Sequence, residues 1–167
     1  MAGIEVIRFN TRGTESAAGK SEGVHDNGGL EKFDVEAAIN FAFDECGVKK
    51  LWVIGWSFGT DVALRHARDP RVAGLILLSP PLITTQESDL EWWDRDGRPI
   101  TALIPEFDEY LKPAEAKERF AALKHIELIN VDEGKHLWVG EPAVYRVLTE
   151  ITKVIAPERL PLPTEWE

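Results

Sequence analysis

The sequence predicts an α/β fold with three layers, in which a doubly wound, mostly parallel sheet of about five strands lies between helices. Short, nearly continuous apolar runs alternate along the chain with longer segments whose apolar residues have helical spacing. Such runs are typical of parallel strands that are covered on both faces. The 167 residues, 44% of them hydrophobic, suffice for one domain with its own core. We therefore expect one domain over residues 1–156, followed by a proline-rich tail over residues 157–167.

The expected strands are rich in β-branched, aromatic and other apolar residues. The clearest is the uninterrupted run Leu51-Trp52-Val53-Ile54, and a second long run ends at Pro80-Pro81. The five expected strands cover residues 4–9, 50–55, 72–79, 99–104 and 126–131.

The expected helices alternate with these strands. Gly47 is placed to end the first, Asp69-Pro70 ends the second, and Pro113 begins the third. Between the second and third helices, residues 82–97 are expected to form a polar connection that contains Trp92-Trp93. The four expected helices cover residues 30–46, 58–68, 113–123 and 142–155.

Charge and cysteine content exclude several kinds of function. The formal net charge of −10 would repel nucleic acids and anionic membranes, and the longest basic run is only Lys49-Lys50. No apolar run approaches the roughly 18 residues that span a membrane, and no secretory signal is visible. The single cysteine, Cys46, cannot form an internal disulfide and is expected to be a buried structural thiol. These features predict a soluble, cytoplasmic protein that binds neither nucleic acid nor membrane.

The sequence Gly55-Trp56-Ser57-Phe58-Gly59 stands where an apolar strand meets a helix. A Gly-x-Ser-x-Gly motif in this setting is typical of a nucleophile elbow, a tight turn that lifts the serine from the edge of the sheet. Glycines at the two ends leave room for the neighbouring strand and helix. The helix start adds partial positive charge where an oxyanion would develop. We therefore predict that Ser57 is a catalytic nucleophile.

A nucleophilic serine needs a histidine as base and a carboxylate that orients the histidine, and in elbow enzymes these follow in the order serine, acid, histidine. Of the four histidines, His25 precedes Ser57, His66 lies within the next helix, and His125 begins a strand. Only His136 follows the end of the last strand, so it is the predicted base.

The acid is expected in the loop after the strand at residues 99–104, which reads Pro105-Glu106-Phe107-Asp108-Glu109. Asp108 is the preferred candidate. Glu106, which is nearer the end of the strand, is the alternative.

Several motifs together resemble those of small bacterial α/β-hydrolases of the dienelactone-hydrolase-like and serine-esterase kind. They are Arg8-Phe9-Asn10-x-Arg12-Gly13, Ser21-Glu22-Gly23, the elbow, Pro105-Glu106-Phe107-Asp108 and Gly134-Lys135-His136. The resemblance covers residues 4 to about 155.

The resemblance implies an esterase that acts on a small-molecule acyl substrate without a metal or organic cofactor, with the amide of Phe58 in the oxyanion hole. The connection 82–97 is too short for the large lid domain of some relatives. The Trp92-Trp93 pair is expected either to line the pocket or to pack against the sheet.

The chain departs from this family at its amino terminus. Relatives usually have three further strands before the one that matches residues 4–9, and one of them lies between the matches to residues 4–9 and 51–54. The loop after that strand donates the second oxyanion-hole amide, and losing one donor typically costs on the order of 100- to 1000-fold in rate. Three explanations are open: the chain is a fragment, the strand at residues 4–9 pairs directly with residues 51–54, or another chain supplies the missing strand. An unpaired sheet edge invites pairing with a second copy, so we expect self-association. The alternative function is a catalytically impaired scaffold that binds a partner or ligand.

Overall fold

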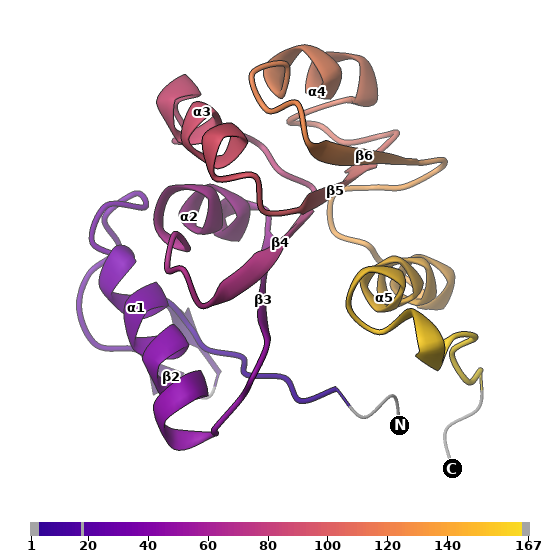
Figure 1. Cartoon of the computed structure of the whole chain (residues 1–167). Coiled ribbons are helices and arrows are strands. Elements are labelled where there is room, and N and C mark those ends of the chain that lie inside the picture. Colours follow the sequence, from indigo (N-terminus) through magenta and orange to yellow (C-terminus); the bar gives the residue numbers. More distant parts are fainter. Residues whose placement is uncertain (1–3, 18, 165–167) are drawn as a thin grey trace.

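The computed structural model describes residues 4–17 and 19–164, and its centre is a parallel sheet of four strands in the order β3-β4-β5-β6 (Figure 1). Each strand pairs in parallel with the next one along the chain. This arrangement brings the carboxyl ends of all four strands to the same edge of the sheet. The strands are β3 (Leu51–Trp56), β4 (Val72–Leu78), β5 (Ile100–Pro105) and β6 (Ile126–Val131).

Helices cover both faces of this sheet (Figure 1). Helices α1 to α4 lie on one face, and α5 lies on the other, so the predicted three-layer α/β fold is confirmed. A short π-helical turn, Phe41–Glu45, extends α1 before Gly47, whose φ of 66° ends the segment. The helices are α1 (Lys32–Asn40), α2 (Phe58–His66), α3 (Glu87–Asp96), α4 (Pro113–Arg119) and α5 (Glu141–Ile155).

The strands are continuously apolar because each one contributes to two cores. On β4, Leu75 and Leu77 join the cluster under α1 to α4, whereas Ile76 and Leu78 join the cluster under α5. Successive side chains of a strand point to opposite faces, so both faces need apolar residues here. The central strands β4 and β5 are therefore almost completely buried.

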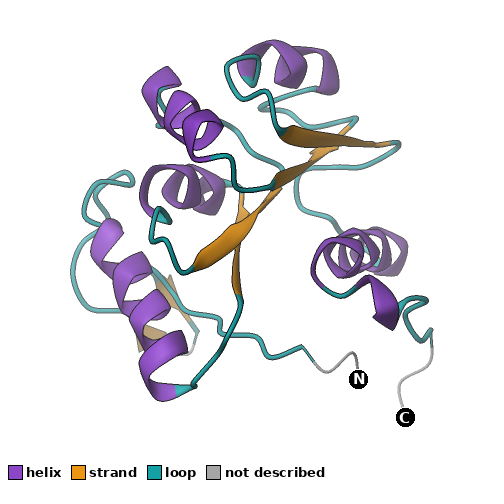
Figure 2. Ribbon diagram, viewed as in Figure 1, coloured by secondary structure: helices purple, strands orange, loops and turns teal. Residues whose placement is uncertain are grey.

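The prediction of a strand over residues 4–9 is wrong. This segment is a loop in Figure 2, and it pairs with no strand in the described part of the chain. Val6 is 81% exposed and Phe9 is 46% exposed. Favourable β-propensity forms a strand only where a neighbouring strand can accept the hydrogen bonds. The sheet thus has four strands rather than five, and within residues 4–17 and 19–164 one edge of β3 has no partner.

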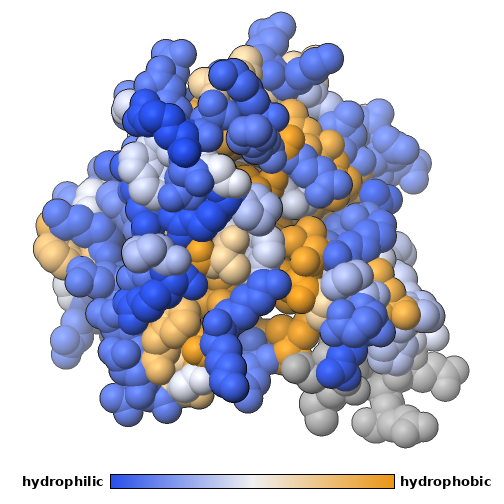
Figure 3. Space-filling model, in the orientation of Figure 1, coloured by the Kyte–Doolittle hydropathy of each residue, from blue (hydrophilic) through white to orange (hydrophobic). Residues whose placement is uncertain are grey.

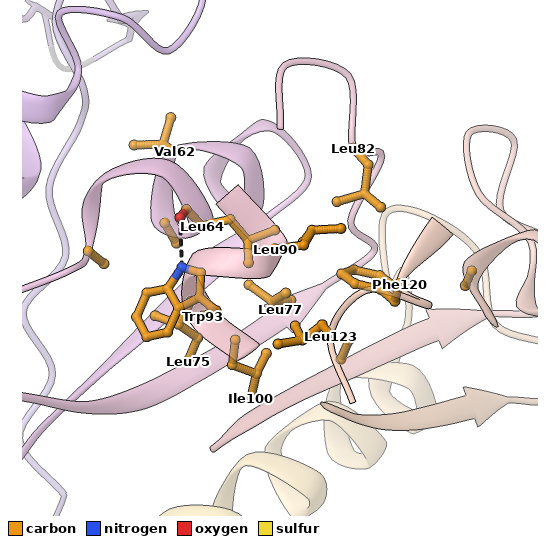
Figure 4. Packing of buried hydrophobic residues seen from close by; sticks show 14 of the residues in the cluster. Val62, Leu64, Leu75, Leu77, Leu82, Leu90, Trp93, Ile100, Phe120 and Leu123 are labelled. Atoms are coloured by element: carbon orange, nitrogen blue, oxygen red, sulfur yellow. Dashed lines mark hydrogen bonds between the residues drawn. The ribbon is translucent and has the colours of Figure 1, made fainter. Parts of the chain in front are cut away.

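Residues 82–97 are not the polar connection that the sequence predicts, because they contain the helix α3. Most residues of α3 are hydrophilic, but Leu90 and Trp93 are apolar and buried. These two residues are three positions apart and so lie on the same face of the helix. Trp93 is 0% exposed and donates a 2.7 Å hydrogen bond from Nε1 to the carbonyl of Leu64 on α2 (Figure 4). Trp92 packs edge-on against Trp93 at a ring-centroid distance of 5.1 Å. Of the two expectations for this pair, packing against the sheet is correct.

The remaining differences concern small segments. Cys46 is exposed rather than buried, because it lies beyond the packed part of the first helix. An antiparallel ribbon pairs β1 (Glu15–Ser16) with β2 (Gly19–Lys20). Residues Pro157–Arg159 of the proline-rich tail form one 3-10 turn. The first three residues of the expected domain and the last three of the tail lie outside the described residues.

The surface in Figure 3 is hydrophilic over the helices, and apolar side chains gather in the middle, where the strands run. Among the described residues, no helix has the length and apolar character that crossing a membrane requires.

Candidate active site

Ser57 occupies a strained turn between β3 and α2. It is the single residue between the two elements, and its backbone has φ 50° and ψ −124°. A positive φ is costly for a residue with a side chain and persists only where the surroundings hold it. Two contacts hold it here: the Ser57 amide donates to the Leu78 carbonyl at 2.9 Å, and the Thr60 amide donates to the Ser57 carbonyl at 2.8 Å. The turn is the elbow that the motif predicts.

The two glycines of the motif have different roles. A Cβ atom on Gly55 would lie 2.5 Å from the carbonyl oxygen of Gly59, so only glycine fits where β3 and α2 meet. A Cβ atom on Gly59 would meet no heavy atom within 4 Å. The expectation that both glycines relieve a collision therefore holds for Gly55 alone.

His136 lies in the loop after β6 and faces Ser57. Its Nε2 atom is 2.8 Å from the Ser57 Oγ atom, and the residue is 7% exposed. Its own carbonyl accepts hydrogen bonds from Trp56 Nε1 at 3.1 Å and from Ser79 Oγ at 3.0 Å. The ring also packs against Tyr110, with 4.8 Å between the ring centroids. These contacts fix both the backbone and the ring of the histidine.

Asp108 lies in the loop after β5 and contacts the other nitrogen of the same ring. Its Oδ2 atom is 2.9 Å from His136 Nδ1. Its Oδ1 atom accepts from the Tyr110 amide at 2.8 Å and from the Leu111 amide at 3.4 Å. Only 2% of Asp108 is exposed. The carboxylate is thus held rigidly, and it accepts the Nδ1–H of His136 in the tautomer that leaves Nε2 free to take a proton from Ser57.

The alternative acid, Glu106, is engaged elsewhere. Its Oε2 atom accepts a 2.8 Å hydrogen bond from the amide of Glu133 and so ties the loops after β5 and β6 together. The structure therefore places Asp108, and not Glu106, against His136.

The other histidines lie in different surroundings. His66 on α2 bonds to the carbonyl of Gly28, and burial lowers its pKa below the ordinary value in spite of that bond. His125 is exposed at the amino-terminal end of β6, the opposite edge of the sheet from the elbow. His25 pairs with Glu31 and contacts the ring of Phe58.

Phe58 is the first residue of α2, so its N–H lies outside the hydrogen-bond ladder of the helix and points where the helix dipole is positive. This is the position expected of an oxyanion donor. In the part of the chain that the structure describes, no group of three or more His, Cys, Asp or Glu side chains could hold a metal ion. Proton transfer and nucleophilic attack are the chemistry that the assembled side chains can perform.

The residues that support His136 carry weaker signals in the sequence than the three residues of the predicted triad. Trp56 lies within the elbow motif, and Ser79 ends the run of β4, so their place at the carboxyl ends of strands was a usable signal. Tyr110 and the His25–Glu31 pair lie in loops, and no periodicity indicates where those side chains meet.

Comparison with known proteins agrees with this fold. A family model for the alpha/beta hydrolase fold matches residues 2–98. The chain is 29% identical over 140 residues to a proline iminopeptidase of Xanthomonas citri. The aligned region covers 81% of this chain and 42% of that protein. The chain thus spans less than half the length of this curated relative.

Solved structures show the same architecture. A serine hydrolase homologue from Coxiella burnetii has a TM-score of 0.72 at 23% identity, over 89% of this chain and 68% of that one. A serine hydrolase without a lid from Xanthomonas campestris has a TM-score of 0.66 at 23% identity, over 93% and 67% of the two chains. An esterase from Pyrococcus furiosus has a TM-score of 0.64 at 22% identity, over 85% and 66%. At these identities, the likeness shows the fold alone.

Proposed function

Since the chain belongs to the α/β-hydrolase fold family, we propose that it is a serine hydrolase that cleaves an ester or related acyl bond through Ser57, His136 and Asp108. The observation that carries the proposal is the unbroken path from the Ser57 hydroxyl through both nitrogens of His136 to the buried Asp108 carboxylate, with separations of 2.8 and 2.9 Å. Those distances lie within the reach that nucleophile activation requires.

The reaction would proceed in two halves. His136 Nε2 takes the proton of Ser57 as Oγ forms a bond to the acyl carbon, and the amide of Phe58 stabilises the resulting oxyanion. The oxyanion collapses, the bond to the leaving group breaks, and His136 returns its proton to that group. Water then attacks the acyl-enzyme with His136 again as base, which releases the acid and restores Ser57. Asp108 keeps the Nδ1 proton of His136 in place throughout.

An ester is the favoured substrate because its leaving group departs more easily than an amine. Among the described residues, the Phe58 amide is the backbone group placed to act as an oxyanion donor, and the loss of one donor from such a site typically costs on the order of 100- to 1000-fold in rate. A small, activated ester tolerates that loss best. The Pyrococcus esterase supports this preference by its name, whereas the iminopeptidase relative favours a peptide bond.

Hydrolysis of p-nitrophenyl acetate tests the proposal, with Ser57→Ala as the control. We expect the parent protein to release nitrophenolate with saturable kinetics, and the variant to fall to the background rate. Equal rates from both proteins would show that Ser57 is not the nucleophile.

A binding or scaffold function is the second candidate. The edge of β3 that has no partner within residues 4–17 and 19–164 favours it, because such an edge can pair with another chain. It predicts a folded chain that hydrolyses no ester at all, so the same assay discriminates between the two functions.

A further inference from the structure

A second histidine–carboxylate pair, His25 with Glu31, lies beside the elbow. We propose that His25 contacts the bound substrate and, with protons on both ring nitrogens, donates a hydrogen bond from Nε2 to the acyl oxygen, alongside the amide of Phe58. This inference rests on the proposed function, because it gives His25 a role in stabilising the oxyanion that attack by Ser57 creates.

The position of His25 follows from its contact with Phe58. The two rings meet edge-on with 4.9 Å between their centroids and 61° between their planes. Phe58 follows Ser57 directly and carries the amide that is expected to face the oxyanion. The side chain of His25 is 51% exposed, so a substrate can reach it. His66, by contrast, is bonded to the carbonyl of Gly28.

The orientation of the ring is set by Glu31. The Nδ1 atom of His25 lies 3.1 Å from Glu31 Oε1, and the side chain of Glu31 is 0% exposed. Within residues 4–17 and 19–164, Nε2 of His25 makes no hydrogen bond, so it is the ring atom left to meet a ligand. As in His136, one ring nitrogen faces a buried carboxylate and the other is open to a ligand. The roles differ, because Nε2 of neutral His136 accepts a proton, whereas His25 must carry protons on both nitrogens to donate from Nε2.

Glu31 supplies a buried carboxylate that accepts from Nδ1 when the His25 ring carries protons on both nitrogens. Burial acts to raise the pKa of Glu31, but backbone hydrogen bonds at Asp26, Glu31 and Gly28 and the charge of His25 outweigh it, so the pKa lies below its ordinary value. The Oε2 atom is buried and has no hydrogen-bond partner among the described residues. A buried carboxylate left with one unpaired oxygen is costly unless a cation compensates it. Arg12, which also interacts with Glu31 electrostatically, is already paired with Asp34 at 3.1 Å.

The loop that carries His25 is built rigidly. The Asp26 amide donates to Glu31 Oε1, and the Leu30 amide donates to Asp26 Oδ2, both at 2.9 Å. From α2, Arg65 donates to the Asn27 carbonyl at 3.2 Å, and His66 bonds to the Gly28 carbonyl. A donor held in advance loses little freedom when charge develops on the substrate, which is the condition for effective oxyanion stabilisation.

The first test replaces the donor while keeping the ring. His25→Phe retains an aromatic contact with Phe58 but cannot donate, whereas His25→Gln restores an N–H. With p-nitrophenyl acetate, we expect His25→Phe to lower kcat/KM by about 10- to 1000-fold, through kcat rather than KM. His25→Gln should recover part of the loss. His125→Phe is the matched control, because it makes the same exchange at the opposite edge of the sheet and should leave both constants unchanged.

A second readout separates a contact with the oxyanion from a structural role. An alkylboronic acid forms a tetrahedral anion on a nucleophilic serine, and its inhibition constant should rise at least tenfold in His25→Phe. The melting temperature reports whether the variant remains folded, and His25→Gln provides the comparison if the phenylalanine variant is destabilised. A change of less than threefold in kcat/KM and in the boronate constant, in folded variants, would overturn the inference while leaving the proposed function intact. A parent protein without Ser57-dependent hydrolysis would overturn both.

Discussion

The Nε2 atom of His136 lies 2.8 Å from the Oγ atom of Ser57, although 79 residues separate them along the chain. Ser57 follows β3, Asp108 follows β5 and His136 follows β6. The parallel register of the sheet therefore assembles the site, because it brings the carboxyl ends of these strands to one edge.

The first prediction concerns the orienting carboxylate. Asp108→Asn should keep the hydrogen bonds from the Tyr110 and Leu111 amides, but its side-chain NH₂ would oppose the Nδ1 proton of His136. We expect kcat for ester hydrolysis to fall by about 10⁴-fold with little change in stability. Glu106→Gln is the matched control and should retain activity within a few fold. The opposite ranking of the two variants would assign the acid to Glu106.

The second prediction uses the two glycines of the elbow. Gly55→Ala places a Cβ atom 2.5 Å from the Gly59 carbonyl oxygen, so β3 and α2 must separate. We expect a loss of about 1–3 kcal/mol in the free energy of unfolding, measured in urea, together with reduced activity. Gly59→Ala meets no heavy atom within 4 Å and should gain about 0.5–1 kcal/mol from helix propensity. Equal effects at both positions would contradict the packing described for the turn.

The third prediction tests the packing of α3. Trp93→Ala removes a completely buried ring and leaves the Leu64 carbonyl without its donor. We therefore expect the free energy of unfolding to fall by about 3–5 kcal/mol. Trp92 is partly exposed and lies beside the guanidinium groups of Arg68 and Arg98. Trp92→Ala should therefore destabilise the protein clearly less. A larger effect at Trp92 would show that the helix presents its other face to the core.

The fourth prediction concerns acid stability. The pKa of Glu31 is lower in the folded chain than its ordinary value of 4.5, because backbone hydrogen bonds and His25 outweigh the opposing effect of burial. Its ionised form therefore stabilises the fold above about pH 4.5, and this contribution is lost as the pH falls through the folded-state pKa. We expect Glu31→Gln to lower the melting temperature at neutral pH and to flatten the decline between about pH 5 and pH 3. Parallel melting curves for the two proteins across that range would refute the assignment.

The fifth prediction concerns the free edge of β3. Along this edge β3 pairs with no strand in the described part of the chain, and Ile54 and Trp56 on β3 are 44% and 49% exposed, which favours pairing with a second copy. We expect light scattering to show a mass that rises with concentration. A single monomeric mass over a hundredfold concentration range would contradict self-association.

Sequence patterns predicted most of the sheet because the buried strands leave a strong signal. The apolar runs of β4 and β5 serve two cores, and their boundaries agree with the prediction within one or two residues. The strand predicted over residues 4–9 does not form, because β-forming residues need a neighbouring strand to pair with. Helix α3 was missed because its two buried side chains lie among eight mostly charged or polar residues.

The candidate site was partly predictable for a similar reason. The elbow motif and the order of serine, acid and histidine place Ser57, Asp108 and His136 at the carboxyl ends of strands. The order of the strands in the sheet then brings these three side chains into contact. The His25–Glu31 pair depends on the path of the loop before α1, which carries no periodic signal. Only the folded chain brings His25 of that pair beside Phe58.

Covalent labelling identifies the nucleophile of this site without a substrate. The protein is incubated with a fluorophosphonate probe, and intact and peptide mass spectra locate the adduct. We expect one probe per chain, attached to Ser57, with no labelling of Ser57→Ala. An adduct on another residue, or equal labelling of both proteins, would contradict the assignment of Ser57 as the nucleophile.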